Sequence, residues 1–242
     1  MKERVIKLNP QDPETGILHV YPASHPNGKA VVMCPGGGFK QINGNHEGAD
    51  FAAWFNERGI TYAWLSYRLP KDNSEGRKPI EDLRLAIRYL QYEKNTWGIC
   101  KTGVMGASIG GYIAGYASTY FFSNDHPEFQ ILLYPIISMT DDFAHIPTRD
   151  CMLGEEVSDE KKDELSLELH VQGAPPTFIA LADDDNVVNP EASRLYCKAL
   201  KKDNTSASLF AFPIGGHSFG FNDAFPFKEH FLKELDKWLK TI

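Results

Sequence analysis

The segment Gly106-Ala107-Ser108-Ile109-Gly110 places a serine between two glycines, after a short apolar run and before a helical stretch of small residues. A Gly-x-Ser-x-Gly segment between a strand and a helix is typical of a nucleophile elbow, in which the serine occupies the tip of a tight, strained turn. Side chains at positions 106 and 110 would collide with the adjacent strand and helix, so the spacing has a steric origin. The segment predicts Ser108 as the nucleophile of an acyl-transfer reaction.

The residues that would activate Ser108 stand later in the chain. A serine hydroxyl needs a base, and a histidine oriented by a buried carboxylate suits that task. His217 lies in a glycine-flanked loop directly after a late apolar run, and three consecutive aspartates at 183–185 follow an earlier one. Asp185 fits the acid best because a valine three residues later would pack back into the core, and Asp184 is the alternative. The order Ser…Asp…His is the one expected for an elbow of this kind.

A run of three glycines at 36–38 follows another apolar run. Such glycines leave backbone N–H groups uncovered and able to approach a ligand closely. We expect the oxyanion of the reaction to be bound by the N–H of Ile109, the residue after the nucleophile, and by that of Gly37 or Gly38. The run matches neither Gly-x-Gly-x-x-Gly nor Gly-x-x-x-x-Gly-Lys-Ser/Thr, which disfavours a nucleotide-binding loop.

The chain contains eight histidines, and His46, close to the glycine run, is an alternative pocket-lining residue. The remaining six are expected at the surface or in packing: His19, His25, His126, His145, His170 and His230. Five aromatic residues near the expected rim of the site have two interpretations, stacking on sugars or ordinary packing: Phe39, Tyr67, Tyr134, Phe219 and Phe221.

Strand-like and helical segments alternate along the chain, which predicts a mostly parallel sheet of eight strands with helices on both faces. Strands are expected at 5–8, 17–21, 29–34, 60–67, 103–105, 129–135, 176–182 and 207–213, the first two as an antiparallel pair. Helices are expected at 46–58, 79–97, 111–117, 190–200 and near the C-terminus. Ligands bind such sheets at the carboxyl ends of the strands, where the glycine run, Ser108, the aspartates and His217 all fall.

A length of 242 residues fits one α/β domain spanning 1–242. Within it, residues 138–173 are rich in acidic residues and weakly apolar, which predicts a small cap or lid inserted between two core strands. The charges themselves are expected on a solvated face: Asp141, Asp142, Glu155, Glu156, Asp159, Glu160, Asp163 and Glu164.

Composition limits the partners and the compartment. The net charge of −7 gives no reason to expect nucleic acid or an anionic membrane as a partner. The apolar runs are much shorter than the ~20 residues of a membrane span. No apolar signal region opens the chain, so we expect a cytoplasmic protein, or a periplasmic or secreted one whose leader has been removed. The four cysteines form no Cys-x-x-Cys pair, and we expect free thiols and no metal.

Six segments together give the chain a resemblance to serine esterases of the α/β-hydrolase superfamily, in particular the acetyl-xylan-esterase-like enzymes of carbohydrate-degrading bacteria. They span residues 34–39, 66–70, 106–111, 133–135, 184–188 and 215–220. The resemblance implies Ser108 as nucleophile, His217 as base and Asp185 as acid. It also implies cofactor-free hydrolysis of short acyl esters, with acetyl groups on small-molecule or oligosaccharide esters as the leading substrates.

Three departures from the usual family pattern affect the expected shape of the pocket: Pro35 before the glycines, Asn189 before Pro190, and Ser218 after the histidine. An oligopeptidase-like serine peptidase is an alternative, although that branch usually carries a further domain. A non-catalytic ligand-binding protein with a hydrolase fold is another, although such proteins typically lose the serine or the histidine. The sequence leaves the oligomeric state open, with a homodimer as one option.

Overall fold

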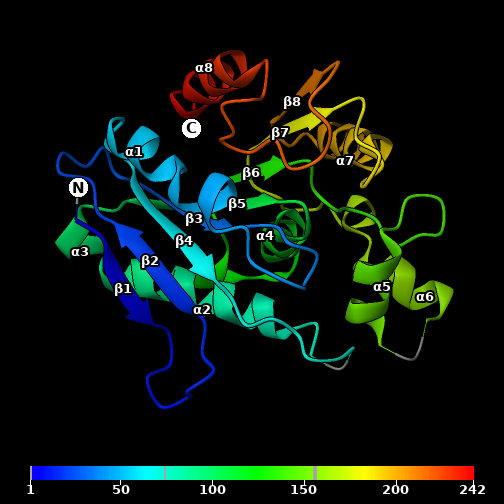
Figure 1. Cartoon of the computed structure of the whole chain (residues 1–242), viewed down its shortest axis with the longest axis horizontal. Helices are drawn as coiled ribbons and strands as arrows, with labels where there is room; N and C mark the ends of the chain where they lie inside the picture. The colour runs from blue at the N-terminus through cyan, green and yellow to red at the C-terminus, as the bar shows by residue number, and fades with distance from the viewer. Residues whose placement is uncertain (1, 74, 155–156) are drawn as a thin grey trace.

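A twisted sheet of eight strands runs through the computed structural model, which describes residues 2–73, 75–154 and 157–242 (Figure 1). The strands lie in the order β1-β2-β4-β3-β5-β6-β7-β8. The pairs β1–β2 and β2–β4 are antiparallel, and every pair from β4 to β8 is parallel, which confirms the predicted sheet. The bounds are β1 Arg4–Lys7, β2 Ile17–Tyr21, β3 Lys29–Cys34, β4 Thr61–Ser66, β5 Lys101–Ala107, β6 Gln130–Leu133, β7 Thr177–Ala182 and β8 Ala207–Phe212.

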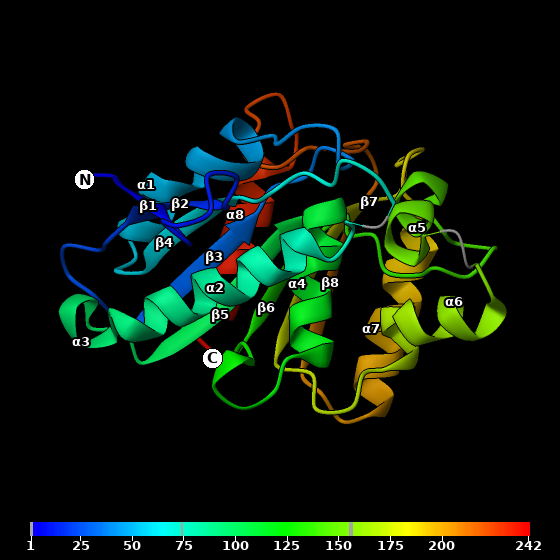
Figure 2. The ribbon, with the colours of Figure 1, turned by 90° about the horizontal axis from the view of Figure 1, so that it is seen from below.

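Helices cover both faces of the sheet, α1 and α8 on one and α2, α4 and α7 on the other (Figure 2). The α-helices are α1 Phe51–Asn56, α2 Lys78–Tyr92, α3 Lys94–Trp97, α4 Ile109–Tyr120, α5 Ile146–Leu153, α6 Asp159–Leu165, α7 Pro190–Lys202 and α8 Lys228–Leu239. Short helical turns of other types occur at Asn45–Ala49, Ser123–Asp125 and Leu167–Leu169. None of the helices within the described ranges is both long enough and apolar enough to cross a membrane.

The alternation of side chains along β3 explains why this strand is apolar throughout. Val31 and Met33 belong to the core beneath α1 and α8, whereas Val32 and Cys34 belong to the core beneath α2, α4 and α7. Successive strand residues point to opposite faces, so a strand covered on both sides needs no polar position. Burial on both faces fixes the carboxyl ends of the central strands.

Two predicted helices differ from the structure. The segment predicted as a helix over 46–58 begins with a π-helical turn at Asn45–Ala49, and only Phe51–Asn56 is α-helical. The long helix predicted over 79–97 ends at Tyr92, because Glu93 leaves helical geometry with φ −83° and ψ 4°. All four cysteines are free, three of them buried and Cys100 exposed, which confirms the prediction of free thiols.

The connection between β6 and β7 carries α5 and α6, which lie beyond the end of the sheet to which the parallel strands point (Figure 1). It is attached to α4: the Tyr112 hydroxyl donates to the carbonyl of Leu165 at 2.9 Å, and fully buried Leu167 packs against Gly115. Arg149 and Lys162 both pair with exposed Asp141. Glu155 and Glu156 of the acidic run lie outside the described residues.

Candidate active site

Ser108 joins β5 to α4 with φ 55° and ψ −120°, a backbone conformation that residues other than glycine rarely adopt. Its N–H donates to the carbonyl of Leu133 at 3.0 Å, and its own carbonyl accepts the N–H of Ile136 at 3.1 Å. A Cβ at position 106 would lie 2.1 Å from the carbonyl oxygen of Gly110, and one at position 110 would lie 2.0 Å from that of Cys34. Both glycines are therefore sterically required for the turn that presents the serine.

The structure brings the three predicted catalytic side chains into one chain of hydrogen bonds. His217 Nε2 lies 2.8 Å from Ser108 Oγ, and His217 Nδ1 lies 2.7 Å from Asp185 Oδ2. The other carboxylate oxygen of Asp185 accepts the N–H groups of Val187 at 2.9 Å and Val188 at 3.0 Å. A carboxylate facing Nδ1 keeps the proton there and leaves Nε2 free to accept the serine proton.

Opposing effects act on the Asp185 carboxyl group. Burial raises its pKa, but the hydrogen bonds from His217 and from the N–H groups of Val188 and Val187 outweigh burial, so the pKa lies below its ordinary value. The side chain is only 2% exposed, and that of His217 is 13% exposed. Asp185 is thus a buried anion beside the imidazole over the whole neutral range of pH.

The two neighbouring aspartates have other partners. Asp183 forms an ion pair with Arg194 of α7. Asp184 Oδ1 accepts the N–H of Gly216 at 2.7 Å, so this carboxylate holds the loop that carries His217 without facing the imidazole. Of the two candidates that the sequence leaves open, Asp185 is the one in contact with the histidine ring.

The glycine run follows β3 and passes beside the nucleophile, since a Cβ at Gly36 would lie 3.0 Å from Ser108 Cβ. The backbone is left-handed at Gly37 and Gly38, with φ 132° and 63°. Within the part of the chain that the structure describes, the N–H groups of Gly37, Gly38 and Ile109 donate to no other residue. These donors are therefore uncommitted beside the serine, as binding of an oxyanion requires.

Glu47, in the π-helical turn, is a member of the site that sequence reasoning missed. It is fully buried and accepts hydrogen bonds from Gly36, Asn43, Tyr134 and Ser218. One signal was available: Glu47 stands four residues before Phe51, on the apolar face of the predicted helix. A charged residue on such a face needs buried partners.

His145, expected at the surface or in packing, lies instead beside the site. It lines a hollow of about 280 Å³ between the β6–β7 connection and the Asp185 loop. Burial lowers its pKa, and repulsion from His217 in its protonated form and from Lys40 lowers it further. The hollow is lined by Asp142, Phe143, Ala144, His145, Asp185, Asn186, Val187, Asn189 and Pro190.

His46 contacts the histidine loop through its backbone, because its carbonyl oxygen accepts the N–H of Phe221 at 2.7 Å. Of the five aromatic residues near the expected rim, Tyr67, Tyr134 and Phe219 are at most 3% exposed. For these three, packing is the role that the structure supports.

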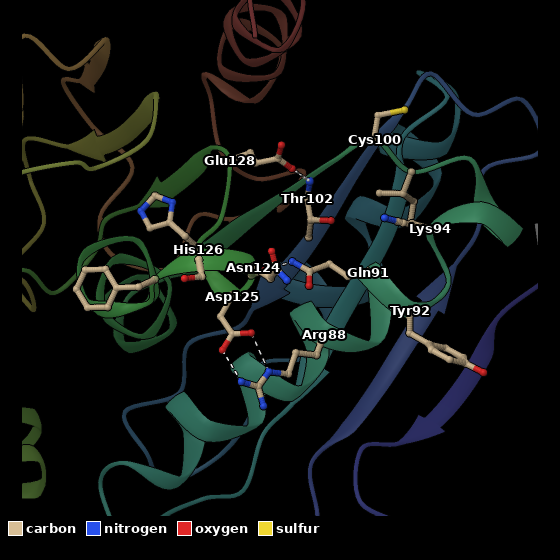
Figure 3. A pocket seen from close by; sticks show the side chains of 13 residues that line it. Arg88, Gln91, Tyr92, Lys94, Cys100, Thr102, Asn124, Asp125, His126 and Glu128 are labelled. Carbon is tan, nitrogen blue, oxygen red and sulfur yellow. Dashed lines mark hydrogen bonds and ion pairs between the residues drawn. The ribbon is translucent and has the colours of Figure 1, made fainter.

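A larger hollow of about 900 Å³ lies at the opposite end of the parallel strands (Figure 3). Thr102 and Glu128, near the starts of β5 and β6, line it together with Arg88 and Asp125, which form an ion pair. None of the residues that line it belongs to the Ser108 site. The volume of a hollow therefore does not by itself indicate where the candidate active site lies in this protein.

Comparison with known proteins agrees with this geometry. Residues 50–242 match the model of the prolyl oligopeptidase family. The chain belongs to this family. Its fold is the α/β-hydrolase fold. The chain matches an acetyl ester-xyloside bifunctional hydrolase from Caldicellulosiruptor lactoaceticus with a TM-score of 0.88 at 28% identity, over 98% of this chain and 96% of that one. A butyrate-bound esterase of Thermogutta terrifontis shares the fold. It is 20% identical and matches with a TM-score of 0.81 over 99% of this chain and 94% of that one.

Curated relatives are longer than this chain. An acetylxylan esterase of Xylanibacter ruminicola is 32% identical in an alignment that covers 97% of this chain and 50% of that protein. Endo-1,4-beta-xylanase B of Butyrivibrio fibrisolvens is 30% identical in an alignment that covers 77% of this chain and 32% of that protein. The chain thus spans half or less of the length of these relatives.

Removing the charge of Asp185 should be far more damaging than removing that of Asp184. We expect Asp185→Asn to lower kcat by about 10³–10⁴, because the amide no longer holds the proton on Nδ1. Asp184→Asn should cost less than about tenfold, since a loop contact is weakened and the imidazole keeps its partner. Steady-state kinetics with Ser108→Ala as background measures both. A reversed ranking would assign the acid to Asp184, and equal losses would contradict the assignment to Asp185.

Alanine substitutions at Gly36 and at Gly38 should have different effects on the protein. Gly36→Ala puts a Cβ 2.7 Å from Glu47 Oε2 and 3.0 Å from Ser108 Cβ, so kcat should fall by about 10²-fold or more as the oxyanion donors move. A Cβ at Gly38 meets nothing within 4 Å, and Gly38→Ala should mainly lower the free energy of unfolding by about 1–2 kcal/mol through its left-handed backbone. Kinetics and thermal unfolding of both variants test this contrast, which equal losses of kcat would contradict.

Proposed function

We propose that this chain is a serine carboxylesterase that hydrolyses short-chain acyl esters, acetyl esters of carbohydrates such as xylan above all. The observation that carries the proposal is the position of His217, which bridges Ser108 and Asp185 at the carboxyl ends of the strands. The printed names of the relatives, an acetylxylan esterase and an acetyl ester-xyloside hydrolase, support the choice of ester. The proposed reaction uses no cofactor.

In the first half of the reaction, His217 Nε2 takes the proton of Ser108 as Oγ attacks the ester carbonyl carbon. The carbonyl oxygen becomes an oxyanion, which the N–H groups of Ile109 and of Gly37 or Gly38 would stabilise. The C–O bond to the alcohol then breaks, and the imidazolium gives its proton to the departing alkoxide. Asp185 stabilises the imidazolium while it exists.

In the second half, a water molecule replaces the alcohol. His217 takes one of its protons, the hydroxide oxygen bonds to the acyl carbon, and the same N–H groups receive the second oxyanion. Breakage of the acyl bond to Ser108 Oγ releases the carboxylic acid, and the proton returns from His217 to the serine. The cycle restores the enzyme with no change in its charge.

We further propose that residues 1–242 act as one catalytic domain in which 138–173 forms a cap over the alcohol side of the ester. The hollow beside Asp185 lies against this segment, and its wall combines the ring of Phe143 with polar groups. Among the described residues, no partner hydrogen-bonds to the side chains of Asp142 and Asn186. Unpaired polar groups beside an aromatic ring suit a sugar, which presents hydroxyl groups and an apolar face.

A serine peptidase is the second candidate, favoured by the membership of the prolyl oligopeptidase family. The same relay of Ser108, His217 and Asp185 would serve an amide bond as well as an ester. A non-catalytic ligand-binding role is the third alternative, to which an intact relay lends no support.

Substrate preference tests the proposal directly. Hydrolysis of p-nitrophenyl esters from acetate to octanoate should be fastest with acetate, and acetate should be released from acetylated xylan. Proline-containing peptide p-nitroanilides serve as the peptidase comparison, and Ser108→Ala gives the background. Rates that rise with chain length would indicate a general esterase, and turnover of the anilides alone would establish the peptidase.

His145 should matter for the alcohol of the ester more than for its acyl group. We expect His145→Ala to lower kcat/KM for an acetylated xylo-oligosaccharide by about threefold to tenfold, the effect of one lost hydrogen bond. The loss for p-nitrophenyl acetate should be smaller, because its aryl group presents no hydroxyl. Parallel kinetics on the two substrates give the ratio, and an equal loss on both would place His145 outside the alcohol site.

A further inference from the structure

Glu47 is a carboxylate buried without a cation: among the described residues, no lysine, arginine or histidine forms an ion pair with it, and its exposed fraction is 0%. Its Oε2 accepts the N–H of Gly36 at 2.8 Å and the amide of Asn43 at 3.2 Å. Its Oε1 accepts the hydroxyls of Tyr134 and Ser218, both at 2.7 Å. All four groups donate to this side chain, and a carboxylate, which only accepts, can satisfy all four at once.

The donors come from three separate strand ends. Gly36 follows β3 and begins the glycine run, Tyr134 follows β6, and Ser218 follows β8 and is the residue directly after His217. Tyr134 extends the connection, because its hydroxyl oxygen accepts the N–H of Gly220 at 3.0 Å and its ring packs edge-on against that of His217 with the centroids 5.0 Å apart. One side chain therefore joins the segment proposed to bind the oxyanion to the segment that carries the base.

Two of these donors stand on strained backbone. The φ angle is 36° at Tyr134 and 65° at Ser218, both in the left-handed region that favours glycine. Such conformations are unfavourable for residues other than glycine and persist where the surroundings hold them. Hydrogen bonds from both side chains to a single buried anion supply that constraint. Burial of the charge is offset in turn by the four charge-assisted bonds.

We infer that Glu47 is a positioning residue of the catalytic machinery: its carboxylate sets the distance between the glycine run, which holds the oxyanion donors, and the loop of His217. Among the described residues it forms no hydrogen bond with Ser108 or His217, and it acts through Gly36 and Ser218. The inference rests on the proposed serine-hydrolase chemistry of the site, although not on the identity of the ester.

Glu47→Gln is the most informative variant because it keeps the volume of the side chain and removes the charge. An amide accepts hydrogen bonds at one end only. The N–H of Gly36 cannot become an acceptor, so the amide oxygen of the variant would face Gly36 and Asn43 and its NH₂ group would face Tyr134 and Ser218. The glycine run keeps its contact, and the histidine loop loses its acceptor. Ser218→Ala removes one hydroxyl of the same contact and leaves the carboxylate.

Two matched control variants distinguish an effect on the geometry of the site from a general loss of protein stability. Thr177→Val removes a buried hydroxyl that bonds Gln130 and the carbonyl of Pro175 at the start of β7, away from the site. It should lower the melting temperature with kcat little changed. Glu57→Gln removes an exposed carboxylate at the end of α1 and should behave as the wild type.

The measurements are KM on p-nitrophenyl acetate and kcat on the same ester, with kcat corrected for the fraction of reactive serines. Titration with diethyl p-nitrophenyl phosphate supplies that fraction: Ser108 Oγ bonds to phosphorus, the P–O bond to the aryl group breaks, and one p-nitrophenolate leaves per serine. We expect Glu47→Gln to lower kcat by about tenfold to a hundredfold, less than the ~10²–10³ for complete loss of an oxyanion donor. KM should change less than threefold, and Ser218→Ala should show a smaller loss of the same kind.

The rate at which diethyl p-nitrophenyl phosphate phosphorylates Ser108 tests the role of Glu47 independently of the proposed esterase function. If no ester is turned over but Ser108 is phosphorylated, the esterase proposal fails, and the slower phosphorylation expected in Glu47→Gln still tests the role of Glu47. A normal rate per reactive serine in Glu47→Gln, with only the melting temperature or the reactive fraction reduced, would overturn the inference and leave Glu47 as a structural residue.

Discussion

The strained backbone of Ser108 is the constraint on which the rest of this molecule depends. A left-handed conformation at a non-glycine residue survives only where its neighbours determine it, and here the neighbours are the ends of β3, β5 and β6. Phe39, Tyr134 and Ser218 carry positive φ angles at the same edge of the sheet. Strain is therefore concentrated where the strands end, and the two cores that sandwich the sheet hold those ends in place.

Two different kinds of interaction then complete the site. Close backbone approach, at Gly106 and Gly110, fixes Ser108 without any side chain. Carboxylates fix the loops: Asp185 holds the imidazole, exposed Asp184 holds the backbone of Gly216, and buried Glu47 joins the glycine run to the histidine loop. The close backbone approach defines the position of the serine, and the hydrogen bonds of the carboxylates set the positions of the other loops relative to it.

Much of this arrangement could be predicted from the sequence, because its causes are local. Continuous apolar runs predicted the buried strands, and glycine spacing predicted the elbow that the structure contains. The spacing of Glu47 from Phe51 indicated an inward position, but its partners depend on a π-helical turn, which has no clear local pattern. The position of His145 depends on how the β6–β7 connection folds back. The valine three residues after Asp185 favoured it over Asp184 in the sequence, and in the structure both carboxylates bond to the same loop while Asp185 is the one that reaches the ring.

The larger hollow, at the starts of β5 and β6, has a practical consequence. It is lined by Cys100, the exposed one of the four cysteines, whereas Cys34, Cys151 and Cys197 are buried. A thiol-reactive dye, spin label or solid support would thus attach at one point, Cys100 (Figure 3). Cys100 precedes the start of β5 and Ser108 follows its end, so molecules tethered there would all present the edge that carries Ser108 to the solution.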